Sequence, residues 1–169
     1  MKVKSNKNKG CSSASKVILS KIDIKSGDMT FGKRIELGEI FQSEISEIEM
    51  FEKVFECLHQ YKPKASDYEK LLGYFSDIVE GIRYWLEAET TMLQYEPSSE
   101  EMQAGIKELS TKIGEYGTIK ALAKAYSKDP DEVLEWKYSK VFGILYTDLE
   151  EFKYQKAYNK VLERKSKAK

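Results

Sequence analysis

The sequence predicts a mainly α-helical fold, a helical bundle of about five helices with a small N-terminal β-hairpin. After residue 43, apolar residues recur at spacings of three and four, which is the period of one helical face. Helix-start signals precede several of these stretches, among them Ser98 with Glu101, and Asp129 followed by Pro130. A chain of 169 residues, 41% of them hydrophobic, can bury one core. We therefore expect a single helical domain over residues 17–163.

The N-terminal part divides into a tail and the hairpin. Residues 1–16 are rich in Lys, Ser and Asn and poor in apolar side chains, which predicts a flexible basic tail. From Val17, apolar residues lead into the turn-forming sequence around Gly27 and continue to Leu37, which predicts two short strands. A lone hairpin is marginally stable, so it must pack on the helices or pair with another chain.

The first two helices are expected over residues 44–62 and 66–93. Pro63 ends the first, because the residue before a proline avoids the α region. Ser66 and Glu69 form a capping box at the start of the second. The apolar face of the first helix carries Ile45, Ile48, Phe51, Val54, Phe55 and Leu58. That of the second carries Tyr68, Leu71, Leu72, Phe75, Ile78, Val79, Ile82, Trp85 and Leu86.

The second half of the chain is expected to be helical as well. A helix over residues 98–113 is followed by Gly114 and Gly117, which predict a helix end and a turn. Thr118 is expected to cap a short helix. The last helical stretch, 130–163, is either one long helix or two, and residues 164–169 are expected to form a basic C-terminal tail.

The formal net charge is zero, but its distribution is uneven. Residues 1–22 carry six lysines and no acid, and residues 160–169 carry five basic residues and one glutamate. The stretch between them, 23–159, has 17 basic and 27 acidic residues, a net charge of −10. An acidic body with two basic ends suggests a protein that works by contact rather than by catalysis.

Residues suited to catalysis or metal binding are few. His59 is the only histidine and the cysteines, Cys11 and Cys57, are far apart, so we expect no zinc site and no disulfide framework. The helix glutamates cannot complete a di-iron site without a second histidine, and no phosphate-loop motif occurs. We therefore predict no catalytic residue, no metal and no cofactor, and a protein that is not an enzyme.

The sequence predicts no membrane partner. Its apolar runs fall short of the roughly 18 residues of a transmembrane helix, and the apolar segment after the basic start is too short for a secretory signal. These features predict a cytoplasmic location.

Residues 118–145 permit an alternative function, a DNA-binding regulator with a helix-turn-helix. Asp129, Asp131 and Glu132 would then lie at the N-terminal end of the recognition helix, where they repel DNA phosphates. The lysines of residues 1–16 would still attract nucleic acid weakly and without sequence preference.

Two stretches carry a family resemblance. The first is Met29-Thr-Phe-Gly-Lys-Arg-Ile-Glu-Leu-Gly-Glu-Ile, and the second is Trp136-Lys-Tyr-Ser-Lys-Val-Phe-Gly-Ile-Leu-Tyr-Thr-Asp-Leu-Glu-Glu. With the general pattern of residues 17–163, they resemble small proteins from the structural gene modules of tailed phages and prophages of gut Bacteroidetes. In outline the chain is similar to tail assembly chaperones, in which a short β element precedes an acidic helical body. This resemblance implies a non-enzymatic protein of virion assembly, located in the cytoplasm of the infected cell or in the virion.

The expected function is therefore that of a phage morphogenesis protein, either a tail assembly chaperone or a virion-associated structural component. Its expected partner is a phage structural protein such as the tail tube or the tape measure, with self-association as a further expectation. An apolar, Tyr-rich groove would cover the partner's assembly surface. The candidate partner-binding residues are tail lysines and aromatic side chains: Lys2, Lys4, Lys7, Lys9, Lys16, Phe31, Tyr138, Tyr154 and Tyr158.

Overall fold

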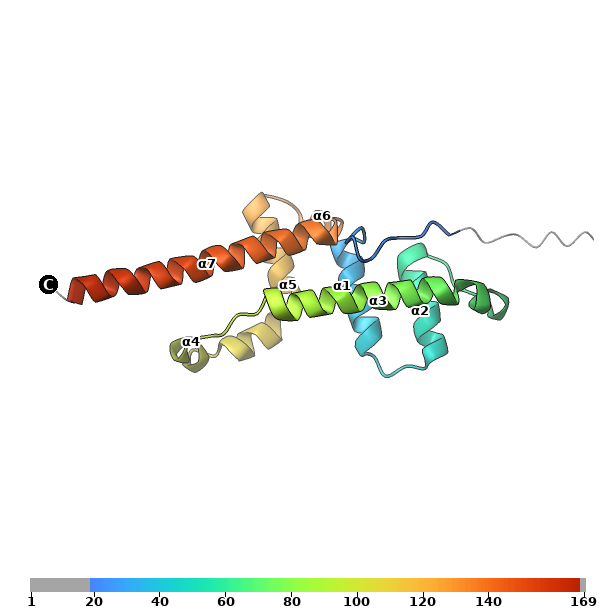
Figure 1. Cartoon of the computed structure of the whole chain (residues 1–169), viewed down its shortest axis with the longest axis horizontal. Helices are drawn as coiled ribbons and strands as arrows, with labels where there is room; N and C mark the ends of the chain where they lie inside the picture. Colours follow the sequence, from blue (N-terminus) through green and yellow to red (C-terminus); the bar gives the residue numbers. More distant parts are fainter. Residues whose placement is uncertain (1–18, 168–169) are drawn as a thin grey trace, which may run out of the picture.

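The computed structural model describes residues 19–167, which form seven α-helices and one short 3-10 helix. The α-helices are α1 (Phe31–Gln42), α2 (Glu47–His59), α3 (Tyr68–Met92), α4 (Ser99–Gln103), α5 (Ile106–Tyr126), α6 (Pro130–Leu134) and α7 (Tyr138–Lys167), and the 3-10 helix η1 (Ala65–Asp67) precedes α3. The mainly α-helical fold is thereby confirmed, with more helices than the five expected. Helix α7 starts beside the C-terminal part of α3 and continues well past its end (Figure 1).

The expected β-hairpin is not found, since residues 19–167 contain no β-strand. Its turn is present, with Gly27 at a φ of 72°, but the second arm is helix α1. Thr30 caps this helix by accepting a hydrogen bond from the backbone N–H of Lys33 at 3.3 Å. The prediction failed because the period of a short apolar segment does not distinguish a strand from a buried helix. The tail expected over residues 1–16 lies outside the described residues.

Residues 22–31 cross from α3 to the start of α7, and we call them the crossing segment. At the α3 end, the backbone N–H of Ile22 donates to the Tyr74 hydroxyl at 2.7 Å. The indole Nε1 of Trp85 donates to the carbonyl of Ile24 at 2.7 Å. Both bonds join the backbone of the crossing segment to side chains of α3. They give hydrogen-bond partners to backbone groups that no regular secondary structure satisfies.

At its other end the crossing segment pairs with the residues between α6 and α7. The N–H of Phe31 donates to the carbonyl of Trp136 at 2.8 Å, and the N–H of Tyr138 donates to the carbonyl of Met29 at 2.8 Å. This short pairing brings the N-terminal turns of α1 and α7 together. The same contact divides the last helical stretch, because residues 135–137 leave the helix to form it.

A buried charged group joins three helices. Arg34 of α1 is 8% exposed, and its Nε donates to Glu89 of α3 at 2.7 Å, while its Nη2 binds the second carboxylate oxygen. The hydroxyl of Tyr138 of α7 donates to the same carboxylate, and the guanidinium carbon lies 5.6 Å from the centre of the Tyr138 ring. Burial and the hydrogen bond to Glu89 raise the pKa of Tyr138, so its hydroxyl stays protonated and keeps donating.

Aromatic side chains fill much of the core. Between α2 and α3, the ring centre of Phe51 lies 5.0 Å from that of Phe75. Between α3 and α7, Trp85 meets Tyr138 at 5.0 Å and Phe142 at 5.1 Å, both edge to face. These large rings bury much apolar surface in contact geometries that aromatic pairs prefer.

Only the start of α7 belongs to this core. Tyr138, Val141 and Phe142 are buried, whereas every side chain over residues 157–167 is exposed. Figure 1 shows this end of α7 projecting from the rest of the chain. Residues 164–167, expected in a C-terminal tail, are the last turn of the helix.

Removing one partner of the Arg34–Glu89 pair should destabilise the fold strongly. We expect Glu89→Leu to lower the free energy of unfolding by about 3 kcal/mol, because the buried guanidinium loses its counter-charge. The double variant Arg34→Met/Glu89→Leu should recover part of that loss; the rest remains because the buried Tyr138 hydroxyl no longer has an acceptor. Urea denaturation measures both values.

The matched control is Glu49→Ala, which breaks an exposed ion pair with Lys53 and should change stability by no more than about 0.5 kcal/mol. Equal losses for Glu89→Leu and Glu49→Ala would contradict the structural role of Arg34.

Candidate functional site

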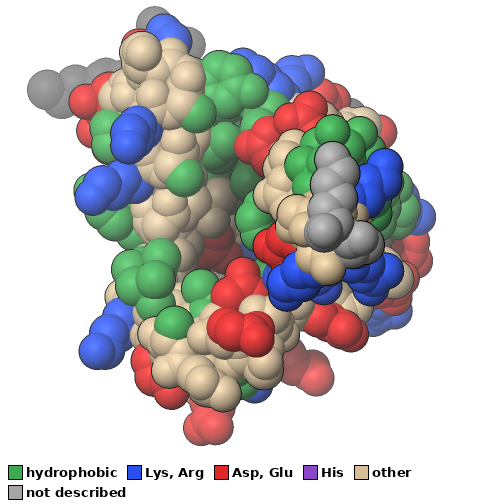
Figure 2. Space-filling view, turned by 90° about the vertical axis from the view of Figure 1, so that its left-hand side faces the viewer, with side chains coloured by type: hydrophobic (Ala, Val, Ile, Leu, Met, Phe, Trp, Pro, Cys, Tyr) green, Lys and Arg blue, Asp and Glu red, His purple; other side chains and the backbone are tan. Residues whose placement is uncertain are grey.

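An open groove of about 600 Å³ lies between α5 and α7. Small and apolar residues make up most of its walls, among them Ile113, Gly114, Gly117, Ala121 and Leu122 from α5 and Leu145 from α7. Figure 2 shows a hollow between α7, which points its C-terminal end toward the viewer, and the part of the molecule opposite, with apolar side chains on both sides.

The groove depends on a bend in α5 at Gly114. This residue has φ 48° and ψ −145°, which is not a helical conformation and which glycine adopts more easily than other residues. The bend lets the first part of α5 follow α4 while the second part crosses α7 (Figure 1). The sequence correctly marks Gly114 as a break, but the chain returns to a helix immediately instead of forming the expected turn up to Gly117.

Apolar side chains on both sides of the bend are left exposed. Before the bend, Leu109 is 52% exposed and Ile113, which lines the groove, is 46% exposed; after it, Ala121 of the lining is exposed. Leu122 forms a buried floor, and Leu145 on the opposite wall is partly buried. Single exposed apolar residues are ordinary, but Ile113, Ala121 and Ala125 are all exposed and border one hollow, which indicates a binding surface.

A second apolar surface lies on the projecting end of α7. We call it the α7 stripe; it consists of Tyr154, Tyr158, Val161 and Leu162, which are between 44% and 68% exposed. The rings of Tyr154 and Tyr158 stack at 6.2 Å between centres. The structure therefore brings these two predicted partner-binding residues together on an open surface.

Phe31 and Tyr138, two other predicted partner-binding residues, are buried. Each is 3% exposed, and their rings stack on each other at 6.1 Å. They are core residues, and a partner at the surface would not reach them. The sequence does not reveal this, because an apolar face has the same pattern whether it meets the core or a partner. The predicted lysines Lys2, Lys4, Lys7, Lys9 and Lys16 lie outside the described residues.

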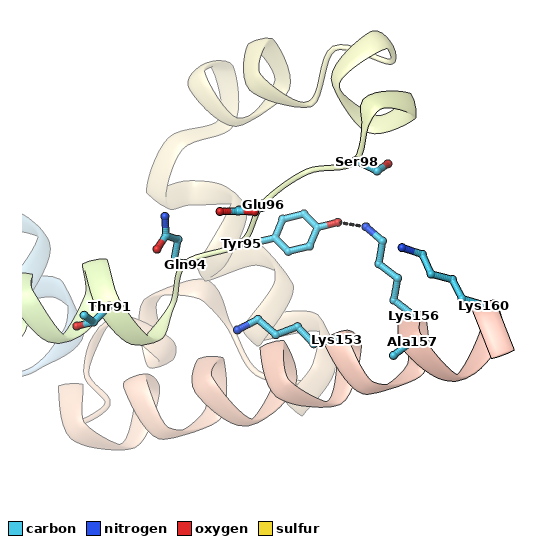
Figure 3. Close-up of a pocket in the computed structure, with 9 residues that line it drawn as sticks. All are labelled: Thr91, Gln94, Tyr95, Glu96, Ser98, Lys153, Lys156, Ala157 and Lys160. Atoms are coloured by element: carbon cyan, nitrogen blue, oxygen red, sulfur yellow. Dashed lines mark hydrogen bonds between the residues drawn. The ribbon is translucent and has the colours of Figure 1, made fainter.

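A polar pocket of about 580 Å³ lies where the loop after α3 meets α7 (Figure 3). The Lys156 ammonium donates to the Tyr95 hydroxyl at 2.8 Å and to Glu101 at 3.1 Å. Hydrogen bonds from the Tyr95 hydroxyl, the Ser98 backbone and Lys156 lower the pKa of Glu101 to about 2. Lys153, which also lines the pocket, pairs with Glu150 at 2.8 Å. Two of the three lysines there already have counter-charges, so the pocket is a poor anion site. The contacts of Lys156 with Tyr95 and Glu101 instead hold α7 against the loop after α3.

The chemically reactive side chains have structural partners. His59 Nε2 lies 2.9 Å from the Tyr74 hydroxyl. Burial is the main cause that raises the pKa of the Cys57 thiol to about 12, and the nearby Glu36 raises it further. This cysteine is therefore a poor nucleophile. Over residues 19–167, the His, Cys, Asp and Glu side chains form no cluster that could hold a metal ion.

Residues 118–145 do not form the two helices of a helix-turn-helix. The helix that would enter DNA is interrupted after five residues, because α6 ends at Leu134 and α7 begins at Tyr138. Asp129 caps α6 and Asp131 lies exposed in its first turn. An acidic helix of this length is unsuited to the major groove.

The bend at Gly114 gives the first prediction for this site. We expect Gly114→Ala to lower the free energy of unfolding by about 1–2 kcal/mol, because a side chain disfavours positive φ. Gly73→Ala is the matched control. Gly73 lies inside α3 with open space around it, so an alanine there should stabilise the protein by about 0.5–1 kcal/mol. Thermal or urea denaturation separates the two outcomes, and stabilisation by both substitutions would show that α5 does not bend there.

A second prediction concerns pH. Burial, and secondly the charge of Lys33, lower the pKa of His59 from its ordinary value of 6.5. As the pH falls, His59 therefore takes up a proton in the unfolded chain before it does so in the folded chain. The stability of the fold should therefore decrease as the pH drops below about 6.5. The His59→Gln variant lacks this pH-dependent loss of stability. Between pH 7.5 and pH 5.5, the urea midpoint of the variant should therefore fall less than that of the unaltered protein. An equal fall in both proteins would exclude His59 as its source.

The chain's surfaces have to be interpreted from their own geometry. Comparison with protein-family models, with curated proteins and with solved structures found no match. In the part of the chain that the structure describes, no helix is both long and apolar enough to cross a bilayer. The α5–α7 groove is the feature that most directly indicates a function.

Proposed function

We propose that this protein is a non-enzymatic phage morphogenesis protein that works by protein–protein binding, as a tail assembly chaperone in the host cytoplasm. A place in the virion as a structural component is the alternative form of the same proposal. The observation that supports it is the open apolar groove between α5 and α7. Its partner would be a phage structural protein such as the tail tube or the tape measure.

The groove suits a partner segment that presents apolar side chains on one face. The glycines and alanines on the α5 wall keep that wall low, so a partner backbone can approach closely. Leu122 at the floor and Ile113 and Leu145 on the sides offer apolar contacts. A helix laid into such a groove would cover exposed apolar surface on both proteins.

Charge supports the same mechanism. The body of the chain, residues 23–159, carries a net charge of −10. A bound assembly segment would be shielded from other copies of the partner, while the acidic exterior keeps the complexes apart. Shielding needs no catalytic group, only a groove that releases the segment when assembly begins.

The test is a variant that fills the groove without disturbing the fold. Ala121 is exposed on α5 and lines the groove, so Ala121→Lys should fold normally. We expect it to weaken binding to the tail tube or tape measure protein encoded beside this gene by roughly tenfold or more, about 1.4 kcal/mol. Co-expression pull-down followed by titration calorimetry measures the loss.

Leu72→Lys is the matched control, because Leu72 is 61% exposed on α3 and does not line the groove. It should leave binding unchanged. Equal binding by Ala121→Lys and the unaltered protein would remove the groove from the proposal. Recovery of no structural protein, together with sequence-dependent DNA binding by the full chain, would favour the regulator instead.

A further inference from the structure

We propose that two copies of this chain pair through the projecting ends of their α7 helices, in antiparallel orientation. The inference depends on the α7 stripe and on the charges around it, and it does not require the proposed function.

The α7 stripe faces away from the body of its own chain. Phe152 packs against Tyr95 at 5.5 Å, and Lys156 binds Glu101 at 3.1 Å, so this face of α7 meets the body. Tyr154 and Tyr158 each lie two residues further along, which is a rotation of about 200° around the helix. Their exposures of 68% and 47% agree with that position. Among residues 19–167 none covers them, so this side of α7 is open to another molecule.

The stripe has the spacing of a helix-pairing face. Its four members are separated by four, three and one residues, which aligns them along one side of α7. The helix is thirty residues and about 45 Å long. A helix end that is exposed on all sides is marginally stable in water, and covering its apolar side would stabilise it.

Charge along α7 decides which molecule fits. Asp148, Glu150 and Glu151 make the helix acidic just before the stripe. Basic residues dominate within and after the stripe, and four of them have no ion-pair partner among residues 19–167: Lys160, Arg164, Lys165 and Lys167. The charges on the α7 ends of two copies are therefore complementary when the two helices run in opposite directions.

The orientation follows from the same charges. An antiparallel pair centred near Ala157 sets Glu150 of one copy opposite Arg164 of the other, with Glu151 within one helical turn of Lys165. The tyrosines of both copies then lie in the middle. A parallel pair would set each charged block against the same block and would be repelled. The paired length is about 20 residues, roughly 30 Å, so the dimer should be reversible and concentration-dependent.

Sedimentation velocity of the full chain, from low micromolar to submillimolar concentration, tests the pairing. We expect a monomer–dimer equilibrium, and Tyr154→Glu/Tyr158→Glu should weaken it by roughly tenfold or more. Tyr84→Glu, at an exposed tyrosine of α3, should leave it unchanged. Circular dichroism checks that each variant folds. A monomer at every concentration, or a dimer that the α7 double variant does not weaken, would overturn the proposal.

Charge exchange tests the orientation. Glu150→Lys/Glu151→Lys should weaken the dimer, and so should Arg164→Glu/Lys165→Glu. The chain with all four changes should dimerise again, because opposite charges face each other once more in the antiparallel pair. In a parallel pair like charges face each other in every one of these variants, so neither double variant would weaken the dimer. Unweakened double variants, or failure of the fourfold variant to dimerise, would contradict the antiparallel arrangement. The groove variant Ala121→Lys should dimerise normally, which separates failure of this inference from failure of the proposed function.

Discussion

The buried pair of Arg34 and Glu89 holds the fold together, because it connects α1, α3 and, through Tyr138, α7. An arginine at 8% exposure needs a carboxylate beside it, and Glu89 supplies one from α3. Tyr138 adds a hydroxyl from α7. Three helices that are distant in sequence are thus fixed by one polar group, and the aromatic core around Trp85 packs against it. The crossing segment reinforces the same junction with backbone hydrogen bonds.

This junction divides the molecule into two parts with different character. Helices α1 to α3, the second part of α5, α6 and the start of α7 share a dense apolar core. Beyond that junction, α4, the first part of α5 and the second half of α7 carry much of the exposed apolar surface of the described chain. The bend at Gly114 and the length of α7 create this open part. The core supplies stability. The groove lies where the two parts meet, and the stripe lies on the projecting end of α7, so both surfaces are open to binding.

Much of the helical content follows from local sequence, whereas the surfaces do not. Helices α2 and α3 lie close to their predicted ranges, because each has a regular apolar face and a clear end. Helix α1 was missed because its apolar segment is short and follows a turn, which fits a hairpin equally well. The exposure of Tyr154 and the burial of Phe31 depend on what packs opposite them, and no local pattern contains that information. The expected groove was apolar and rich in tyrosine, but no tyrosine among the described residues lines the α5–α7 groove. Its position depends on the direction that α5 takes after Gly114, which no local pattern predicts.

In the proposed function, the α5–α7 groove receives a segment of a structural protein. Hydrogen exchange measured by mass spectrometry, on the full chain alone and in complex with the structural protein recovered by co-expression, tests it most directly. This role predicts slower exchange on binding over residues 113–125 and 145–149, where the groove walls lie. Unchanged exchange over both ranges, with protection confined to α1–α3, would contradict it.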